Sequence, residues 1–240
     1  MAESPSDEPP ELNSRGGVDW DVDPLTEQTR RFLEATAPAH DELQAEMAAY
    51  ADEHGFPIVG RTAGGVLRSV ARLTDAERVF EFGSGYGYSA SWFLRGMPED
   101  GEIVLTEEDA DELALGEELL ARAGYADRVT FEPGDAMETV RRYDGPFDVV
   151  LIDHLKALYA DAFELVRQKV RPGGAVVADN VLRGGIDPEA VLTALEGGPL
   201  PEDDNSRGMA DYVRTVRDAP AFETVLLPVD EGLALSTRIE

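Results

Sequence analysis

Residues 79–93 read "VFEFGSGYGYSASWF", a short apolar run followed by glycines at 83, 85 and 87 and then by the start of a helical pattern. Glycine lets the backbone approach a ligand closely, and the N-terminus of a helix favours anionic groups. A glycine-rich loop at such a place is typical of sites for nucleotide-like ligands. The loop alone leaves open whether the ligand is NAD or S-adenosylmethionine, or whether the glycines only connect a strand to a helix.

The hydropathy pattern around this loop predicts an α/β fold. Five short segments rich in apolar and β-branched residues alternate with amphipathic helical patterns, as in a parallel sheet that is covered on both faces. These predicted strands are residues 78–82, 102–106, 128–132, 147–152 and 174–179. Two further strands, 222–229 and 233–239, are separated by only three residues and predict an antiparallel hairpin. We therefore expect a seven-stranded, mostly parallel sheet.

The length of the chain, 240 residues, suits one domain of this kind with an addition at its N-terminus. Residues 24–74 carry three helical patterns ahead of the first predicted strand. The first 19 residues are dominated by Ser, Pro, Glu and Asp and are expected to be disordered. The sequence thus predicts an acidic tail over 1–19 and a single domain over 20–240, with added helices in 20–75 and the core in 76–240.

The composition is strongly acidic, with 49 acidic and 21 basic residues and a formal net charge of −28. The acidic residues are spread along the chain, and the repulsion between them should destabilise the folded state in dilute buffer. Concentrated salt screens this repulsion, so we interpret the composition as halophilic. An acidic patch for a basic partner is the alternative interpretation. The chain has no cysteine, no long apolar run and no signal-peptide pattern. These features predict a cytoplasmic protein without disulfides, thiolate metal sites or membrane partners.

Polar residues follow the predicted parallel strands, at the edge where an open parallel sheet binds its ligands. Glu107 lies twenty residues beyond Gly87, a position from which a carboxylate can accept hydrogen bonds from ribose hydroxyls. Acids also favour the first turn of a helix, so Glu107 could equally belong to the helix that follows. In the same way, Asp135 fits either a helix N-cap or a contact to an adenine amino group.

Hard oxygen ligands follow the fourth and fifth predicted strands. Asp153, Asp179 and Asn180 suit Mg²⁺ or a similar cation that keeps positions free for water and substrate. Taken singly, Asp153 also fits a helix cap, and the other two fit a turn. Lys156 is one of only two lysines in the chain, and lysine rather than arginine is needed where a proton is exchanged. The other lysine, Lys169, is expected in the last turn of a helix.

Taken together, these motifs resemble those of the class I S-adenosylmethionine-dependent O-methyltransferases of the cation-dependent kind, such as the catechol and caffeoyl-coenzyme A enzymes. The resemblance rests on Glu81, "GSGYGYSA" (83–90), Glu107, "GDA" (134–136), "DVVLIDHLKALY" (148–159) and "RPGGAVVADNVLRGG" (171–185). It covers roughly residues 57–185, and its "DHxK" and "DN" motifs are far more specific than the glycine loop. It implies a Rossmann-like methyltransferase fold and favours S-adenosylmethionine over NAD.

The resemblance also implies roles for individual residues. The cofactor-binding set is Val59, Glu81, Gly83, Ser84, Gly85, Gly87, Ser89, Glu107, Asp135, Ala136, Asp153 and His154. The metal ligands are Asp153, Asp179 and Asn180, and the catalytic residues are Asp153 and Lys156, the latter as the base beside the attacking hydroxyl. Leu155 departs from the pattern, because catechol O-methyltransferase has an aromatic residue there. Asp211 matches loosely as a substrate-binding carboxylate.

The implied reaction moves the methyl group of S-adenosylmethionine to a hydroxyl of a small molecule, such as one of two adjacent hydroxyls on an aromatic ring, with help from Mg²⁺ or a similar cation. A hydroxyuridine in tRNA is an alternative acceptor, although the net charge and the lack of a basic cluster speak against nucleic acid. A nicotinamide-dependent oxidoreductase would leave "DHLK" and "DN" unused, and a cofactor-binding module without catalysis is a further alternative. The apolar N-terminal helices suggest a homodimer.

Overall fold

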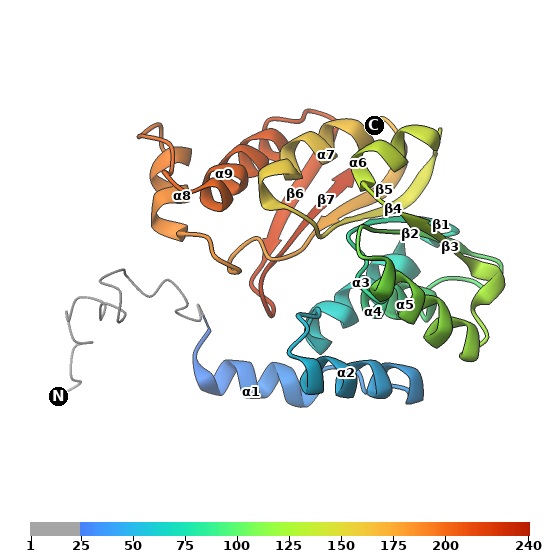
Figure 1. Ribbon diagram of the computed structural model, residues 1–240. Coiled ribbons are helices and arrows are strands. Elements are labelled where there is room, and N and C mark those ends of the chain that lie inside the picture. Colours follow the sequence, from blue (N-terminus) through green and yellow to red (C-terminus); the bar gives the residue numbers. More distant parts are fainter. Residues whose placement is uncertain (1–24) are drawn as a thin grey trace.

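The computed structural model describes residues 25–240 and contains a seven-stranded sheet with helices on both faces (Figure 1). The strands are β1 (Arg78–Phe82), β2 (Glu102–Glu107), β3 (Val129–Pro133), β4 (Phe147–Ile152), β5 (Val170–Ala178), β6 (Phe222–Leu227) and β7 (Leu233–Arg238). Their order across the sheet is β3-β2-β1-β4-β5-β7-β6. β1 to β5 are parallel, whereas β7 is antiparallel to both β5 and β6. The predicted sheet and its closing hairpin are confirmed.

The direction in which strands are added to the sheet reverses at β1. This strand pairs with β2 on one side and with β4 on the other, so that Phe82 lies opposite both Thr106 and Ile152. The helical connections that follow β1 and β4 leave this point in opposite directions and pack on opposite faces of the sheet. A crevice is left between them, beyond the carboxyl ends of the strands. The fold therefore provides a ligand site at the carboxyl ends of β1 and β4.

Three helices precede β1, as predicted: α1 (Glu27–Thr36), α2 (Glu42–His54) and α3 (Arg61–Leu73). The later helices are α4 (Tyr88–Leu94), α5 (Ala110–Arg122), α6 (Ala136–Thr139), α7 (Tyr159–Val166), α8 (Pro188–Leu195) and α9 (Asp204–Arg217), with short 3₁₀ turns η1 (Ala126–Arg128), η2 (Val140–Arg142) and η3 (Lys156–Leu158). Within residues 25–240, no helix has the length and apolar character needed to cross a membrane. The predicted acidic tail, residues 1–19, lies outside the described residues.

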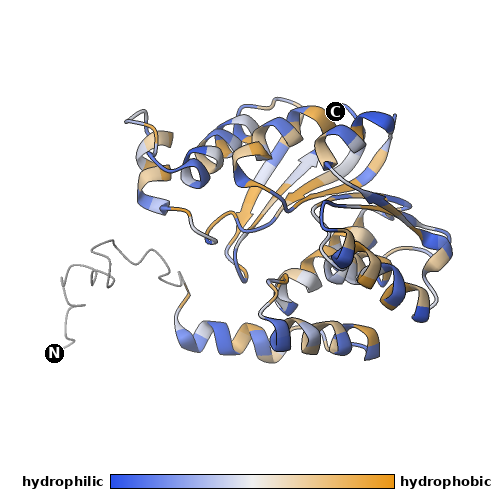
Figure 2. Cartoon of the chain, viewed as in Figure 1, coloured by the Kyte–Doolittle hydropathy of each residue, from blue (hydrophilic) through white to orange (hydrophobic). Residues whose placement is uncertain are grey.

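Apolar side chains pack against both faces of the sheet. Because successive strand residues point to opposite faces, Val79 belongs to one core, whereas Phe80 and Phe82 belong to the other. Helices α3, α4 and α5 cover the first face, and α6, α7 and α9 cover the second (Figure 1). The central strands are accordingly apolar over most of their length, as Figure 2 shows. Glu81 is an exception, since this carboxylate in β1 is completely buried.

The predicted position of Lys169 in the last turn of a helix is wrong. Helix α7 ends at Val166, and Lys169 lies in the connection to β5. Its Nζ donates hydrogen bonds to the carbonyl oxygens of Val140 (2.7 Å) and Tyr143 (2.6 Å). The ammonium therefore holds η2 and the residue that follows it against this connection, instead of completing a helix.

The fifth strand starts four residues earlier than the sequence predicts. Val170 already pairs with Phe147, and after a shift in register the regular pairing resumes with Ala175 opposite Val149. The Pro-Gly-Gly sequence in between reads as a turn, but here it forms an irregularity within β5.

Candidate active site

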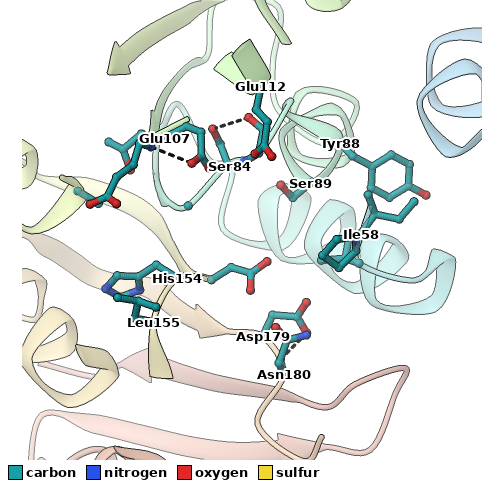
Figure 3. Close-up of a pocket in the computed structure, with 18 of the residues that line it drawn as sticks. Ile58, Ser84, Tyr88, Ser89, Glu107, Glu112, His154, Leu155, Asp179 and Asn180 are labelled. Atoms are coloured by element: carbon teal, nitrogen blue, oxygen red, sulfur yellow. Dashed lines mark hydrogen bonds between the residues drawn. The ribbon is translucent and has the colours of Figure 1, made fainter. Parts of the chain in front are cut away.

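A cavity of about 890 Å³ lies over the carboxyl ends of β1 and β4, where the strand order predicts a site. In Figure 3, Glu107 and Glu112 lie on one side of it, and Asp179 and Asn180 lie on the opposite side. The predicted site residues that line it are Val59, Gly83, Ser84, Gly85, Ser89, Glu107, Asp135, Ala136, Asp153, His154, Asp179 and Asn180. The fold thus brings most of the candidate set, which is spread over more than 120 positions of sequence, to one place.

The glycine loop passes close to the end of β4. Gly83 has a φ of 75°, and a Cβ at this position would lie 2.4 Å from the carbonyl oxygen of Asp153. Any other residue would therefore be strained and would push the ends of β1 and β4 apart. Gly87 is the N-cap residue of α4 and does not contribute to the lining of the cavity.

Glu107 ends β2 and faces the glycine loop. Its carboxylate accepts hydrogen bonds from the backbone N–H groups of Gly85 (2.9 Å), Glu108 (2.8 Å) and Asp109 (3.0 Å). The N-cap of α5 is Asp109, so Glu107 is not needed to start that helix. A carboxylate fixed in this way on the cavity wall still has lone pairs with which it can accept hydrogen bonds from ligand hydroxyls.

Glu81 lies behind Ser89, which itself lines the cavity. The Ser89 hydroxyl donates a hydrogen bond to Glu81 Oε1, while Oε2 is buried and has no partner. Burial raises the pKa of Glu81 to about 8. A buried acceptor without a partner is costly, and a ligand ammonium is a group that would satisfy it.

His154 also has unsatisfied polar atoms. Both of its ring nitrogens are buried without hydrogen-bond partners, and its ring stacks on Tyr159 with centroids 5.6 Å apart. Burial lowers the pKa of His154 to about 4, so the ring is neutral at pH 7. Nearby, Asp135 accepts a hydrogen bond from Met137 N–H (2.7 Å) as the N-cap of α6 and lines the cavity together with Ala136. A polar, planar ligand group fits this part of the cavity.

The two aspartates of the predicted metal site follow neighbouring strands, since Ile152 of β4 pairs with Ala178 of β5. Asn180 adopts a left-handed φ of 56°, and its N–H donates to Asp179 Oδ1 at 2.7 Å. Burial raises the pKa of Asp179 to about 7. Burial, together with repulsion from Asp179, raises the pKa of Asp153 well above its usual range.

These three residues fit a divalent cation. Two carboxylates that are poorly stabilised as anions would be compensated by a positive charge, and oxygen donors are the ligands that Mg²⁺ prefers. Asp153 is not a helix cap, because the N-cap residue of η3 is Leu155. Among the described residues, no three or more His, Asp or Glu side chains are grouped around one metal position. The third protein donor would therefore be the amide oxygen of Asn180.

Lys156 lies beside this group at the start of η3. A Cβ at Gly184, which lines the cavity, would be 2.9 Å from Lys156 Nζ and 3.5 Å from the Cβ of Asn180. Burial lowers the pKa of Lys156, although the charges of Asp153 and Asp179 act in the opposite direction. A lowered pKa makes a lysine better suited to give up and take up a proton than an ordinary surface lysine.

Part of the cavity wall consists of residues that the sequence analysis did not assign. Phe56, Ile58, Tyr88, Glu112 and Glu231 line it, and Figure 3 shows Ile58 and Tyr88 together at one end. These residues come from the segment before α3, from α4, from α5 and from the β6–β7 loop. Tyr88 lies within the "GSGYGYSA" stretch but carried no predicted role, and the other four belong to none of the quoted motifs. The acidic β6–β7 loop could be recognised in the sequence, but its place beside the site depends on the strand order.

Two further residues that the sequence analysis named lie differently in the structure. Leu155 lines the cavity, and the residue is 69% exposed. Asp211 is absent from the cavity lining, because it lies on α9 and forms an ion pair with Arg214 at 3.5 Å. Nothing in its position connects it to a bound substrate.

The strand order, the glycine loop at the reversal point and the acidic end of β2 define a Rossmann-like class I methyltransferase. A family model described as O-methyltransferase matches residues 36–239. The chain belongs to this family and is an S-adenosylmethionine-dependent O-methyltransferase, similar to the catechol and caffeoyl-coenzyme A enzymes.

Relatives of both kinds are found. The chain is 31% identical to the catechol O-methyltransferase of Mycobacterium tuberculosis over 227 residues, which are 90% of this chain and 97% of that protein. It is 27% identical to the caffeoyl-CoA O-methyltransferase of Eucalyptus gunnii over 85% of this chain and 83% of that protein.

Solved structures agree on the fold. A cofactor-bound protein from MTB superposes with a TM-score of 0.76 at 27% identity and covers 90% of this chain and 99% of its own. An O-methyltransferase from Bacillus cereus, in complex with SAH, has a TM-score of 0.76 at 22% identity over 88% of this chain and 97% of its own. The nicotinamide-dependent oxidoreductase, which the sequence left as an alternative, is not supported by any of these relatives.

Proposed function

We propose that this methyltransferase transfers the methyl group to one of two adjacent hydroxyls on a small aromatic acceptor, with a divalent cation such as Mg²⁺ held by Asp153, Asp179 and Asn180. The proposal rests on the convergence of these oxygen donors with Lys156 at one end of the cavity. The names of the relatives agree with a hydroxyl acceptor.

The proposed contacts to the cofactor use groups that lack partners within the chain or have spare acceptor capacity. Glu81 Oε2 would accept a hydrogen bond from the cofactor ammonium, and Ser89 would lie beside the cofactor carboxylate. Glu107 would accept hydrogen bonds from the ribose hydroxyls. His154 and Ala136 would border the adenine.

When bound, S-adenosylmethionine supplies a methyl group on a positively charged sulfur, and a divalent cation supplies a charge that lowers the pKa of the attacking hydroxyl. The residues of the chain supply orientation and proton transfer. Lys156 Nζ would accept the proton of the hydroxyl, and the walls of the cavity would hold the oxygen and the methyl carbon in line at near-attack distance.

A screen with labelled S-adenosylmethionine, Mg²⁺ and concentrated KCl tests this function against a panel of vicinal diols and against tRNA. We expect labelled product from catechol-like diols. Product from tRNA alone would replace the small-molecule acceptor by the hydroxyuridine alternative. Tight cofactor binding without product from any acceptor would instead indicate a cofactor-binding module.

Replacing Glu107 with alanine is expected to weaken binding of S-adenosylhomocysteine by about 1.5 to 3 kcal/mol, roughly 10- to 150-fold in Kd. The variant loses the proposed ribose acceptor and also the acceptor that fixes Gly85 N–H. Isothermal titration calorimetry measures the change. Glu117→Ala on the exposed face of α5 is the control. An unchanged Kd for Glu107→Ala would assign the ribose contact to another residue.

Binding of S-adenosylhomocysteine at pH 7 is expected to release close to one proton. The pKa of Glu81 is about 8 in the free protein, so the carboxyl is mostly protonated at pH 7. An ammonium next to Oε2 favours the ionised form, and the proton is lost on binding. Calorimetry in buffers with different ionisation enthalpies measures the release, which should vanish above about pH 9 and in Glu81→Gln. Absence of proton release at pH 7 would contradict the contact.

A second copy of the chain is the protein partner that we propose. Helix α1 has no buried side chain and leaves Phe32 69% exposed, and the edge strand β6 exposes Val225 and Leu226. Sedimentation in concentrated KCl should show a dimer, and a monomer at micromolar concentration would refute it. The cytoplasmic location and the salt requirement stay predictions from the sequence.

A further inference from the structure

The loop between β6 and β7 reaches the start of a helix on the other side of the cavity. Asp230 in this loop has a left-handed backbone with a φ of 48°. One of its carboxylate oxygens accepts a hydrogen bond from Ala63 N–H at 2.7 Å, in the first turn of α3. The two residues are 167 positions apart in the sequence. The contact therefore joins distant parts of the chain, unlike a local helix cap.

Helix α3 has no side-chain cap of its own. Its N-cap residue is Gly60, which has no side chain that could accept a hydrogen bond from the first turn of the helix. A Cβ at Gly60 would lie 2.2 Å from the carboxyl group of Asp230. Glycine at this position thus admits the distant carboxylate, which supplies the missing acceptor. The segment immediately before it, residues 56–59, lines the cavity.

The same loop is also attached to the opposite wall. The carbonyl oxygens of Glu231 and Gly232 accept hydrogen bonds from the N–H groups of Leu182 (3.1 Å) and Val181 (3.0 Å). These two residues directly follow Asp179–Asn180, which line the cavity. The loop therefore bridges the wall formed by residues 56–59 and the wall that carries the proposed metal ligands.

We propose that Asp230 is a positioning residue, which holds the wall of residues 56–59 at a fixed distance from the Asp179–Asn180 wall. The inference rests on the proposed function in one respect: that function identifies the ligands between the two walls as the cofactor and the aromatic acceptor. Asp230 is not among the residues that line the cavity. Its removal should loosen one wall of the cavity without removing a reacting group, so that affinity falls more than turnover.

The first test compares Asp230→Ala with Asp230→Asn. Loss of a helix cap corresponds to roughly a fivefold to tenfold change in an equilibrium constant. We expect Asp230→Ala to raise the Kd for S-adenosylhomocysteine and the KM for catechol by about this factor, with kcat within about twofold of the parent value. Asp230→Asn retains a side-chain oxygen for Ala63 N–H and should recover most of the affinity.

The second test approaches the same contact from its other side. Gly60→Ala introduces a Cβ where the Asp230 carboxyl lies and should reproduce the rise in Kd and KM. In the double variant, Gly60→Ala with Asp230→Ala, the carboxyl group that would collide with the new Cβ is absent. The double variant should therefore bind S-adenosylhomocysteine no more weakly than Asp230→Ala alone. Strict additivity of the two changes would contradict a shared contact. If Asp230→Ala does not fold, Asp230→Asn and Gly60→Ala provide the same comparison.

Asp41→Ala is the matched control. Asp41 caps α2, which has 13 residues like α3, by accepting a hydrogen bond from Gln44 N–H at 2.9 Å, and it does not line the cavity. The Asp41→Ala substitution should lower the unfolding temperature and leave the Kd for S-adenosylhomocysteine and the KM for catechol unchanged. The inference is overturned if Asp230→Ala behaves like Asp41→Ala, with a lower unfolding temperature and parental Kd and KM. If the unsubstituted protein binds S-adenosylhomocysteine but methylates no acceptor, the proposed function is refuted. The comparison of Kd values between the variants would still decide whether Asp230 positions the wall of residues 56–59.

Discussion

Replacing Lys156 with arginine is expected to lower kcat by about 10²- to 10⁴-fold, because a positioned general base contributes about that factor and a guanidinium cannot take up the proton. The positive charge is retained, so the fold and the affinity for S-adenosylhomocysteine should be preserved. Turnover with catechol as acceptor and calorimetry with S-adenosylhomocysteine measure the two effects.

Lys169→Arg provides a matched control, since it makes the same change at the only other lysine of the chain. Lys169 is bonded to two backbone carbonyls away from the cavity, and its replacement should leave kcat unchanged. If Lys156→Arg turned over at the parental rate, Lys156 would contribute only a positive charge, and the proton would leave by another route.

Replacing Asp179 with asparagine is expected to affect stability and activity in opposite directions. Turnover should fall at least about 100-fold, since even groups that only support a metal ligand typically account for 10- to 100-fold. The metal-free protein should become more stable at pH 8. The pKa of Asp179 is about 7, above the ordinary value of 3.8, so ionisation of this carboxyl destabilises the fold as the pH rises through that range.

Thermal unfolding in the presence of a chelator and turnover with saturating Mg²⁺ measure these two effects. Asparagine keeps the Oδ1 acceptor for Asn180 N–H, so the local hydrogen bond is retained. Asp211→Asn on α9 is the control and should change neither quantity. Parental turnover in Asp179→Asn would remove this residue from the reaction.

The sheet could be predicted because each strand is bounded by turn residues and each carries an apolar run of strand length. The run at residues 147–152 is buried at every position in the structure, as expected for a central parallel strand. The prediction was wrong where local signals conflicted. The Pro-Gly-Gly sequence after Arg171 concealed the first half of β5, and Lys169 was assigned to a helix that ends at Val166.

The part of the candidate site that lies at the ends of the parallel strands could be located from the sequence, because the strands themselves could be predicted. Residues at or just after the carboxyl end of a parallel strand must meet at one edge of the sheet, and Glu107, Asp153 and Asp179 do so. Ile58 and Glu231 could not be placed in this way, because they lie in irregular segments whose positions depend on tertiary contacts. The Asp230 contact to α3 is of the same kind, since no local pattern links a hairpin loop to a helix 167 residues earlier.

The most direct test of the account is methyl transfer to catechol before and after exhaustive chelation of the enzyme, at constant KCl concentration. We expect labelled product from the enzyme with Mg²⁺, almost none after chelation, and full recovery when Mg²⁺ is added back. Binding of S-adenosylhomocysteine should persist throughout, because none of the proposed cofactor contacts needs the cation. Undiminished transfer by the chelated enzyme would contradict the proposed roles of Asp153, Asp179 and Asn180.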